Sequence, residues 1–112
     1  MVEINLKKEG DVDVLEVIGE VDASSSIQLD NALKNAIESG DGKLLIDCKS
    51  LDYISSAGLG VFMSYIEDIN AKGAKMIIVG LNDKVKNVFN ILGLDQLLET
   101  AASKEEGTER MK

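Results

Sequence analysis

Hydrophobic and polar residues alternate along the first twenty positions of the chain. Apolar side chains occupy every second position of 2–6, and a second apolar run covers 12–18 after a turn at Gly10. A period of two residues is typical of strands that are buried on one face. The pattern therefore predicts a β-hairpin, or at least two strands, at the start of the chain.

Helical periodicity then alternates with short continuous apolar runs. Apolar residues recur at helical spacing within 29–37, 59–69 and 85–92. Between these segments, 43–48 and 75–80 each contain a short continuous apolar run, as expected of strands buried on both faces. The predicted order is β-β-α-β-α-β-α, which indicates an α/β domain with a mixed, mostly parallel central sheet of four to five strands and three to four helices.

Residues that favour helix ends stand at the boundaries of the three helical segments. Glycines follow the segments at Gly40, Gly73 and Gly93, the usual stop position. The candidate N-terminal caps are Asp22 or Ser24, Ser55 or Ser56, and Asn82 or Asp83.

The chain length and the weak apolar content near the C-terminus set the expected domain limits. The 112 residues suit one domain, which we place at 1–100. Within it, 95–100 is expected to form a short edge strand or a turn. The tail, 101–112, has few large apolar residues and is expected to be a frayed helix or disordered.

Charge and hydropathy narrow the environment and the partners. The formal net charge is −8, and such a surface repels nucleic acid and anionic lipid. It favours a protein partner with a basic face. No apolar stretch is long enough to cross a bilayer, so we expect a soluble, cytoplasmic protein without membrane contact.

Residue types that are absent or rare exclude several kinds of chemistry. The chain has no histidine, which removes Ser-His-Asp and Cys-His activation and every histidine-based metal site. Its one cysteine, Cys48, stands in an apolar run and is interpreted as a buried hydrophobic residue. Trp is absent and aromatic residues are few, so a base-stacking surface is not expected. We predict no metal and no cofactor.

The segment 53–60, YISSAGLG, carries the most informative chemistry. It stands between a predicted strand and a predicted helix, where ligands and reactive groups gather in α/β folds. Ser55 and Ser56 are each open to interpretation as a helix cap or a phosphate acceptor. A hydrolase elbow needs a glycine where Ile54 stands if Ser56 is the nucleophile, or where Ala57 stands if Ser55 is, together with a histidine base. The GLG triplet lacks the spacing of a phosphate-binding loop, so a nucleotide-binding domain is a weak alternative.

Three stretches together resemble the STAS family and, within it, the bacterial anti-sigma factor antagonists. They are GEVD at 19–22, LLIDCKSLDYISSAGLGVF at 44–62, and GAKMIIVGLNDKVKNVFNILGL at 73–94. The resemblance covers about residues 1–100 in order and implies the STAS fold. The family's phosphorylated serine lies two residues before the Gly of Gly-Leu-Gly, a position held here by Ser56.

The resemblance implies a partner switch and no enzyme activity. An antagonist of this family binds a kinase-type anti-sigma factor and thereby releases the sigma factor. The kinase then phosphorylates the antagonist, and a phosphoserine phosphatase reverses this. The implied phosphoacceptor is Ser56, with Ser55 as its rival. The implied partner-binding residues are Asp22, Ser24, Ser55, Ser56, Ala57, Gly58, Leu59 and Gly60.

Two positions depart from the family pattern. Ser55 stands where the family usually has Asp, and Ala57 stands where it usually has Ser or Thr. Because some STAS proteins are not phosphorylated, the alternative function is a non-phosphorylated STAS interaction or scaffold module in a sensory assembly. We expect a monomer when the protein is free.

Overall fold

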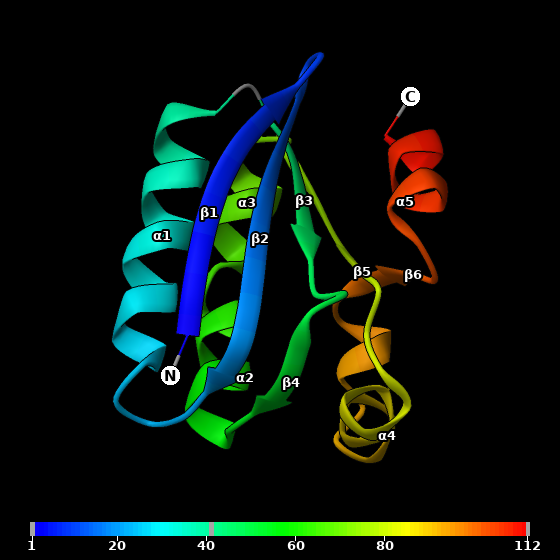
Figure 1. Cartoon of the computed structure of the whole chain (residues 1–112). Coiled ribbons are helices and arrows are strands. Elements are labelled where there is room, and N and C mark those ends of the chain that lie inside the picture. Colours follow the sequence, from blue (N-terminus) through cyan, green and yellow to red (C-terminus); the bar gives the residue numbers. More distant parts are fainter. Residues whose placement is uncertain (1, 41, 112) are drawn as a thin grey trace.

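The computed structural model describes residues 2–40 and 42–111, which form one layered α/β unit (Figure 1). In these residues, no helix is both long and apolar enough to cross a membrane. The elements, in chain order, are β1 (Val2–Glu9), β2 (Val12–Val21), α1 (Ser26–Ser39), β3 (Lys43–Asp47), β4 (Leu51–Ile54), α2 (Ser56–Ser64), α3 (Ile66–Ala71), β5 (Lys75–Val79), α4 (Asp83–Ile91), the 3-10 helix η1 (Leu94–Gln96), β6 (Glu99–Ala101) and α5 (Lys104–Arg110).

The sheet is mixed and mostly parallel, as the sequence predicts. The strand order is β1-β2-β3-β5-β6, and only β1 pairs antiparallel, with β2. The long strand β2 pairs with β3 along residues 13–16 and with β4 along residues 19–21. One strand therefore positions two successive segments of the chain, and the second of them leads directly into α2.

The main core lies between the sheet and the helices α1, α2, α3 and α4. Alternate residues of β2, β3 and β5 point into it, including Leu15, Ile46 and Ile78, which are at most 1% exposed. The helices contribute residues at the predicted spacing, such as Leu33 from α1 and Phe89 from α4. Cys48 also lies in this core and is fully buried, which raises the pKa of its thiol far above the ordinary value.

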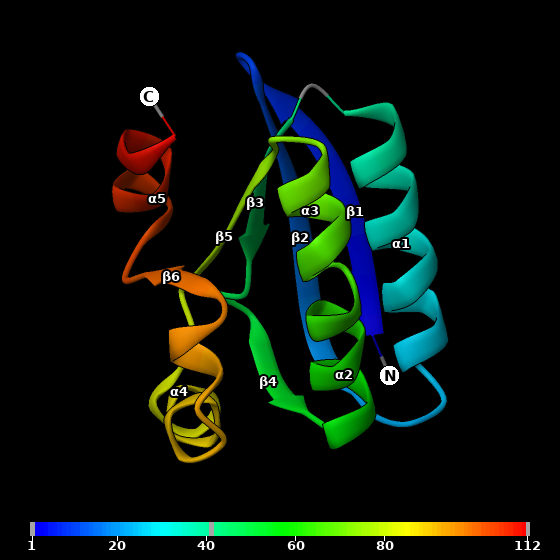
Figure 2. The same cartoon turned by 180° about the vertical axis from the view of Figure 1, so that it is seen from behind.

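The opposite face of the sheet carries a second, smaller core beneath α5 (Figure 2). The sequence predicts a frayed helix or disorder at 101–112; the structure has a helix there, and this helix packs against β3, β5 and β6. Gly107 allows the close approach, because a Cβ at this position would come within 2.6 Å of both Leu45 Cδ1 and Val79 Cγ1. Met111 is 4% exposed and joins the same cluster.

Two further differences affect the surroundings of α2. No strand is predicted between 43–48 and the helical segment at 59–69, but residues 51–54 form β4, a sixth strand in the described part of the chain. The sequence also predicts one helix up to Gly73, but the helix is divided at Tyr65 into α2 and α3. The Tyr65 hydroxyl donates to Asp30 Oδ1 of α1 at 2.8 Å, which holds the junction against the neighbouring helix.

Part of two predicted apolar stripes, those at 59–69 and 85–92, lies at the surface. The predicted core positions Met63 and Leu92 are 41% and 57% exposed, while Phe62 and Phe89 beside them are buried. The predicted helical period is correct, but the buried side of each of these helices is narrower than the side that carries apolar residues. The excess apolar side chains are therefore available at the surface.

Candidate functional site

The start of α2 is fixed by its neighbours in the sheet. The backbone N–H of Ser55 donates to Val21 O at 2.7 Å, at the point where β2 and β4 end together. Gly58 then packs closely, because a Cβ there would come within 2.7 Å of Ile54 Cγ1 and 2.8 Å of Val21 Cγ1. The turn is therefore held by one strand-to-helix hydrogen bond and by one close glycine contact.

The two serines of this turn have different roles in the structure. Ser55 is the N-cap of α2, and its Oγ accepts a hydrogen bond from the Gly58 N–H at 3.3 Å. Ser56 is the first helical residue, its side chain is exposed, and within residues 2–40 and 42–111 its hydroxyl makes no hydrogen bond. The N–H groups of the first helical turn also favour a negative charge at this position.

The family's Asp at the position of Ser55 has a structural equivalent here. Ser and Asp are both strong N-cap residues, because each side chain offers an oxygen to the N–H groups of the first turn. Ser55 makes this contact with Gly58. The departure from the family pattern therefore preserves the cap while it removes one negative charge next to Ser56.

The residues after the serines do not form a continuous exposed surface. Gly58 and Leu59 are implied by the resemblance to bind the partner, but both are buried, and Leu59 is only 3% exposed. Their direct role in the structure is packing. The exposed part of the turn consists of Ser56, Ala57 and Gly60.

A second turn lies beside the first one, because Asp22 follows Val21, which binds Ser55. Asp22 and Ser25 form a reciprocal pair in which the Asp22 N–H donates to Ser25 Oγ at 2.8 Å and the Ser25 N–H donates to Asp22 Oδ1 at 2.9 Å. This is the geometry of a capping box. Asp22 therefore caps the turn before α1, and Ser24 contributes a further hydroxyl bond to its carboxylate. The N-cap of the helix itself is Ser25, not the predicted Asp22 or Ser24, and its side chain makes no capping bond to the helix.

These hydrogen bonds lower the pKa of the Asp22 carboxyl from 3.8 to about 2; the Ser25 N–H contributes most, followed by the Ser24 and Ser25 hydroxyls. Asp22 is thus a fixed negative charge at neutral pH beside the Ser56 turn. Ser25 was not among the predicted site residues, although it is only 6% exposed and organises the turn. The sequence signal for it was the spacing of three residues between Asp22 and Ser25.

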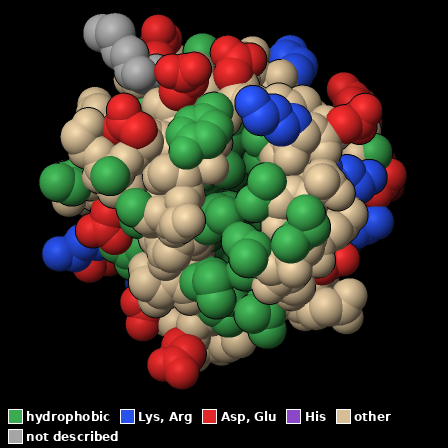
Figure 3. Space-filling model, turned by 90° about the horizontal axis from the view of Figure 1, so that it is seen from below, with side chains coloured by type: hydrophobic (Ala, Val, Ile, Leu, Met, Phe, Trp, Pro, Cys, Tyr) green, Lys and Arg blue, Asp and Glu red, His purple; other side chains and the backbone are tan. Residues whose placement is uncertain are grey.

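The end of the molecule that carries both turns has an exposed apolar area. Figure 3 shows hydrophobic side chains gathered across the middle of this end, with acidic and some basic side chains around them. The elements located there carry large exposed hydrophobic residues, including Tyr53 of β4 at 42% and Ile91 of α4 at 73% exposure. Exposed apolar areas of this kind often mark protein interaction sites.

Other kinds of site find little support in the described residues. No group of three or more His, Cys, Asp or Glu side chains there is arranged to hold a metal ion. A groove of about 460 Å³ lies between α1 and α3, away from Ser56, and it is lined by Asp30, Lys34, Ile37, Glu38, Tyr65, Asp68, Ala71 and Lys72. Three carboxylates among these residues make the groove a poor site for the phosphates of a nucleotide.

Comparisons with known proteins agree with this geometry. The family profile described as STAS domain matches residues 3–107. The chain belongs to the STAS domain family. A relative from Listeria monocytogenes named anti-sigma-B factor antagonist is 30% identical over 95 residues, which cover 82% of each chain.

Solved STAS proteins share the fold of this STAS domain. An anti-sigma factor antagonist from Mycobacterium paratuberculosis superposes with a TM-score of 0.92 at 18% identity, covering 99% of this chain and 94% of the other. The Bacillus cell fate determinant SpoIIAA in its phosphorylated form gives a TM-score of 0.73 at 20% identity, covering 98% and 100%. At these identities the likeness establishes the fold, and the STAS match includes the α5 region up to residue 107.

Proposed function

We propose that this STAS domain is a cytoplasmic anti-sigma factor antagonist, without enzyme activity of its own, that is switched off by phosphorylation of Ser56. In its unphosphorylated form it binds a kinase-type anti-sigma factor and so releases the sigma factor. The kinase then phosphorylates Ser56, and a phosphoserine phosphatase restores the binding form. Relatives named as anti-sigma-B factor antagonists support the general role.

One observation carries the choice of Ser56. Of the two adjacent hydroxyls, that of Ser55 is engaged as the helix cap, whereas that of Ser56 is exposed at the start of α2. A kinase needs an accessible hydroxyl and supplies the base, the metal and ATP itself. The acceptor therefore needs no histidine, which agrees with a chain that has none.

The surroundings explain how a phosphate would act as a switch. A phosphoryl group adds about −1.5 to −2 charges at neutral pH. At Ser56 it would stand near the fixed charge of Asp22, at the end of the molecule that also carries the apolar area. Docking a partner over that area would then require removal of water from a doubly charged group, which weakens the complex.

The first test is phosphorylation by the kinase-type anti-sigma factor and ATP, followed by mass spectrometry of the intact chain and its fragments. We expect one phosphate on the wild type and on Ser64→Ala, and none on Ser56→Ala. Ser64 is the matched control because it is an exposed serine of the same helix outside the partner-binding residues. A phosphate that persists on Ser56→Ala at Ser55 would show that the assignment is wrong.

The second test measures binding to the same kinase. Ser56→Asp should weaken binding by at least about tenfold, a difference of about 1.4 kcal/mol. Ser64→Asp, an exposed position in the last turn of the same helix, should leave it unchanged. If the wild type receives no phosphate and Ser56→Asp binds the kinase as tightly as the wild type, the protein would instead be the non-phosphorylated interaction module.

A further inference from the structure

Strand β1 is an open edge of the sheet. In the described part of the chain it pairs with β2 alone, and their register runs without interruption from Val2 to Glu9. In Figure 1 no helix or loop lies in front of β1, and in Figure 2 the strand lies at the far edge. Natural proteins usually protect an edge strand by making it short, by a bulge, by proline, by a covering segment or by charged side chains, above all Lys. This one has eight residues, and the whole chain lacks proline. Its charged residues are of both signs, Glu3, Lys7, Lys8 and Glu9, so they can pair as well as repel.

In place of the monomer expected from the sequence, we propose that β1 is the contact surface for a second copy of this chain, with the two β1 strands pairing antiparallel about a two-fold axis at Asn5. A two-fold axis perpendicular to the sheet makes the two strands antiparallel and leaves each side chain on the same face of the sheet. Two residues that lie directly opposite each other therefore point to the same face. Because side chains alternate between the faces along a strand, the residue numbers of such a pair add up to an even number. With the axis at Asn5, the two residue numbers of every pair add up to ten.

The side chains of β1 complement one another in this register. On the outer face of the sheet, Glu3 stands opposite Lys7 of the second copy, and symmetry repeats this opposite-charge pair. On the inner face, Ile4 stands opposite Leu6, again twice. Ile4 packs against the main core, whereas Leu6 is 50% exposed and would gain its missing apolar neighbour.

The neighbouring even registers are less favourable. A sum of twelve would place Glu3 opposite Glu9, which brings like charges together. Pairs whose residue numbers add up to eight would involve only residues 2–6, so Lys7 would face no acidic residue of the second copy. The sum of ten pairs seven residues, 2–8, and is the one of these three registers in which both Glu3 and Lys7 find a partner.

Helix α1 is also suited to this arrangement. It packs against both β1 and β2, so that in a continuous sheet two α1 helices would lie about two strand spacings, or roughly 10 Å, apart. This is the usual distance between packed helices. At 100° per residue, the flank of α1 on the β1 side carries Gln28, Ala32 and Asn35, none of them charged. The opposite flank faces α3, where Asp30 accepts from Tyr65.

The pairing can be tested by charge reversal and mixing, with sedimentation velocity between about 0.01 and 1 mM protein. Wild type should form dimers within this range. Glu3→Lys alone and Lys7→Glu alone should each dimerise at least about tenfold more weakly, because each variant opposes like charges twice. An equimolar mixture should dimerise as well as wild type, because Lys at position 3 then faces Glu at position 7.

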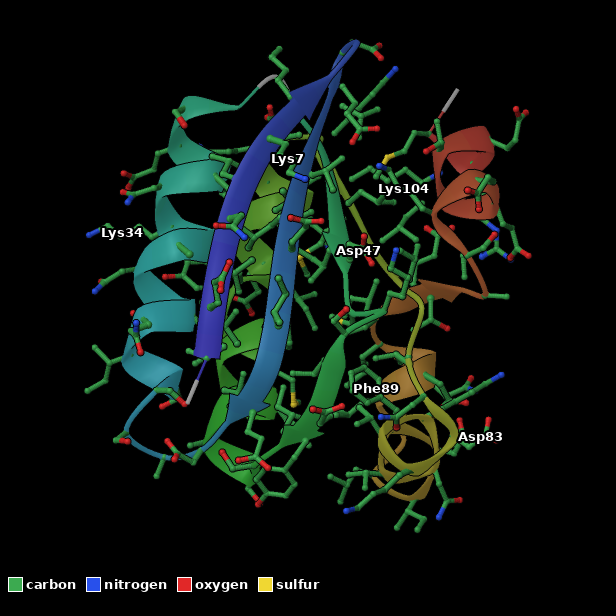
Figure 4. All side chains as sticks on the ribbon, in the orientation of Figure 1. Lys7, Lys34, Asp47, Asp83, Phe89 and Lys104 are labelled. Atoms are coloured by element: carbon green, nitrogen blue, oxygen red, sulfur yellow. The ribbon has the colours of Figure 1, made fainter. Side chains whose placement is uncertain are left out.

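The mixture also controls for folding. Lys7, labelled in Figure 4, extends from β1 toward β2, where its Nζ lies 3.2 Å from Glu16 Oε1. Lys7→Glu therefore also replaces an attractive pair with a repulsive one inside each single chain. Mixing cannot repair a misfolded chain, but it does restore the pairs between chains. A wild type that stays monomeric at 1 mM, or a mixture that dimerises no better than its components, overturns the proposal.

Cysteine cross-linking fixes the register. In the proposed dimer, Asn5→Cys places two thiols on the axis, with Cα atoms about 4.5–5.5 Å apart. Diamide should oxidise these two thiols to one disulfide and itself be reduced to the hydrazide. Leu6→Cys, whose copies would be diagonal neighbours about 7–8 Å apart, should cross-link poorly. Preferred cross-linking of Leu6→Cys would overturn the register, and buried Cys48 serves as the internal unreactive control.

Discussion

Two helices begin at the same end of this STAS domain, and both begin at a run of serines. Before α1, the hydroxyls are used locally: Ser25 and Ser26 are buried, and Ser24 and Ser25 donate to Asp22. Before α2, Ser55 is used as the cap, and Ser56 remains exposed without a bond in the described structure. A serine is thus a candidate modification site when its hydroxyl is exposed and makes no hydrogen bond within the protein. The sequence around a serine does not show whether its hydroxyl is already bonded.

The comparison also extends to the backbone. The first turn before α1 is stabilised by polar contacts between side chains and N–H groups. The first turn of α2 depends in addition on close packing of Gly58 against Val21 and Ile54. The two starts should therefore respond to different substitutions.

The largest effect is expected from added volume at the start of α2. Gly58→Val should lower the free energy of unfolding by about 2 kcal/mol, because the new side chain would overlap Val21 and Ile54. Gly60→Ala is the matched control: its Cβ meets nothing within 4 Å, and it should raise the free energy of unfolding by about 0.5–1 kcal/mol. Urea denaturation measures both, and equal effects would contradict the close packing.

A smaller effect separates the two serines of the α2 turn. Ser55→Ala should cost about 1 kcal/mol of unfolding free energy, because the Gly58 N–H loses its side-chain acceptor. Ser56→Ala should change it by less than about 0.5 kcal/mol, as for other exposed positions. Ser55→Asp should retain most of the stability, since Asp caps as well as Ser. Similar losses for both alanine variants would remove the distinction between the two serines.

The smallest effect concerns the charge before α1. The Asp22 carboxyl should titrate near pH 2 instead of 3.8. The chemical shift of its carboxyl carbon, measured by NMR as a function of pH, reports this titration. Because the folded-state pKa lies below the unfolded value, the carboxylate's contribution to stability is complete above about pH 4 and is lost as the pH falls toward 2. In Ser25→Ala the pKa should rise, since one hydroxyl donor is removed. A midpoint at 3.8 in the wild type would contradict the hydrogen-bonded turn.

The sequence predicted the parts of the fold that rest on hydrophobic periodicity. The hairpin, the strands at 43–48 and 75–80, and the three helical faces all appear in the structure. It missed β4, because only the two ends of LDYI are buried and the strand pairs with β2 beyond a shift in register. It also missed the docking of α5, because that contact depends on Gly107, which contributes no apolar side chain.

The candidate site was predictable in location but only partly in detail. A strand-to-helix turn with serines was visible in the sequence, and the STAS resemblance pointed to Ser56. The division of roles between Ser55 and Ser56 depends on one hydrogen bond to Gly58, and two residues of the same type at adjacent positions give no sequence signal for it. The Asp22–Ser25 pair depends likewise on the local path of the chain.

The docking of α5 also bears on how this STAS domain can be shortened for experiments. A cut after residue 100 would follow the boundary that hydrophobicity suggests, but it would remove both Gly107 and Met111. The strip beneath them consists of apolar residues from β2, β3 and β5, namely Val12, Val14, Leu45, Ile77 and Val79. Once uncovered, such an apolar patch favours aggregation. Helix α5 therefore shields this apolar part of the sheet from solvent, and a shortened chain should keep it.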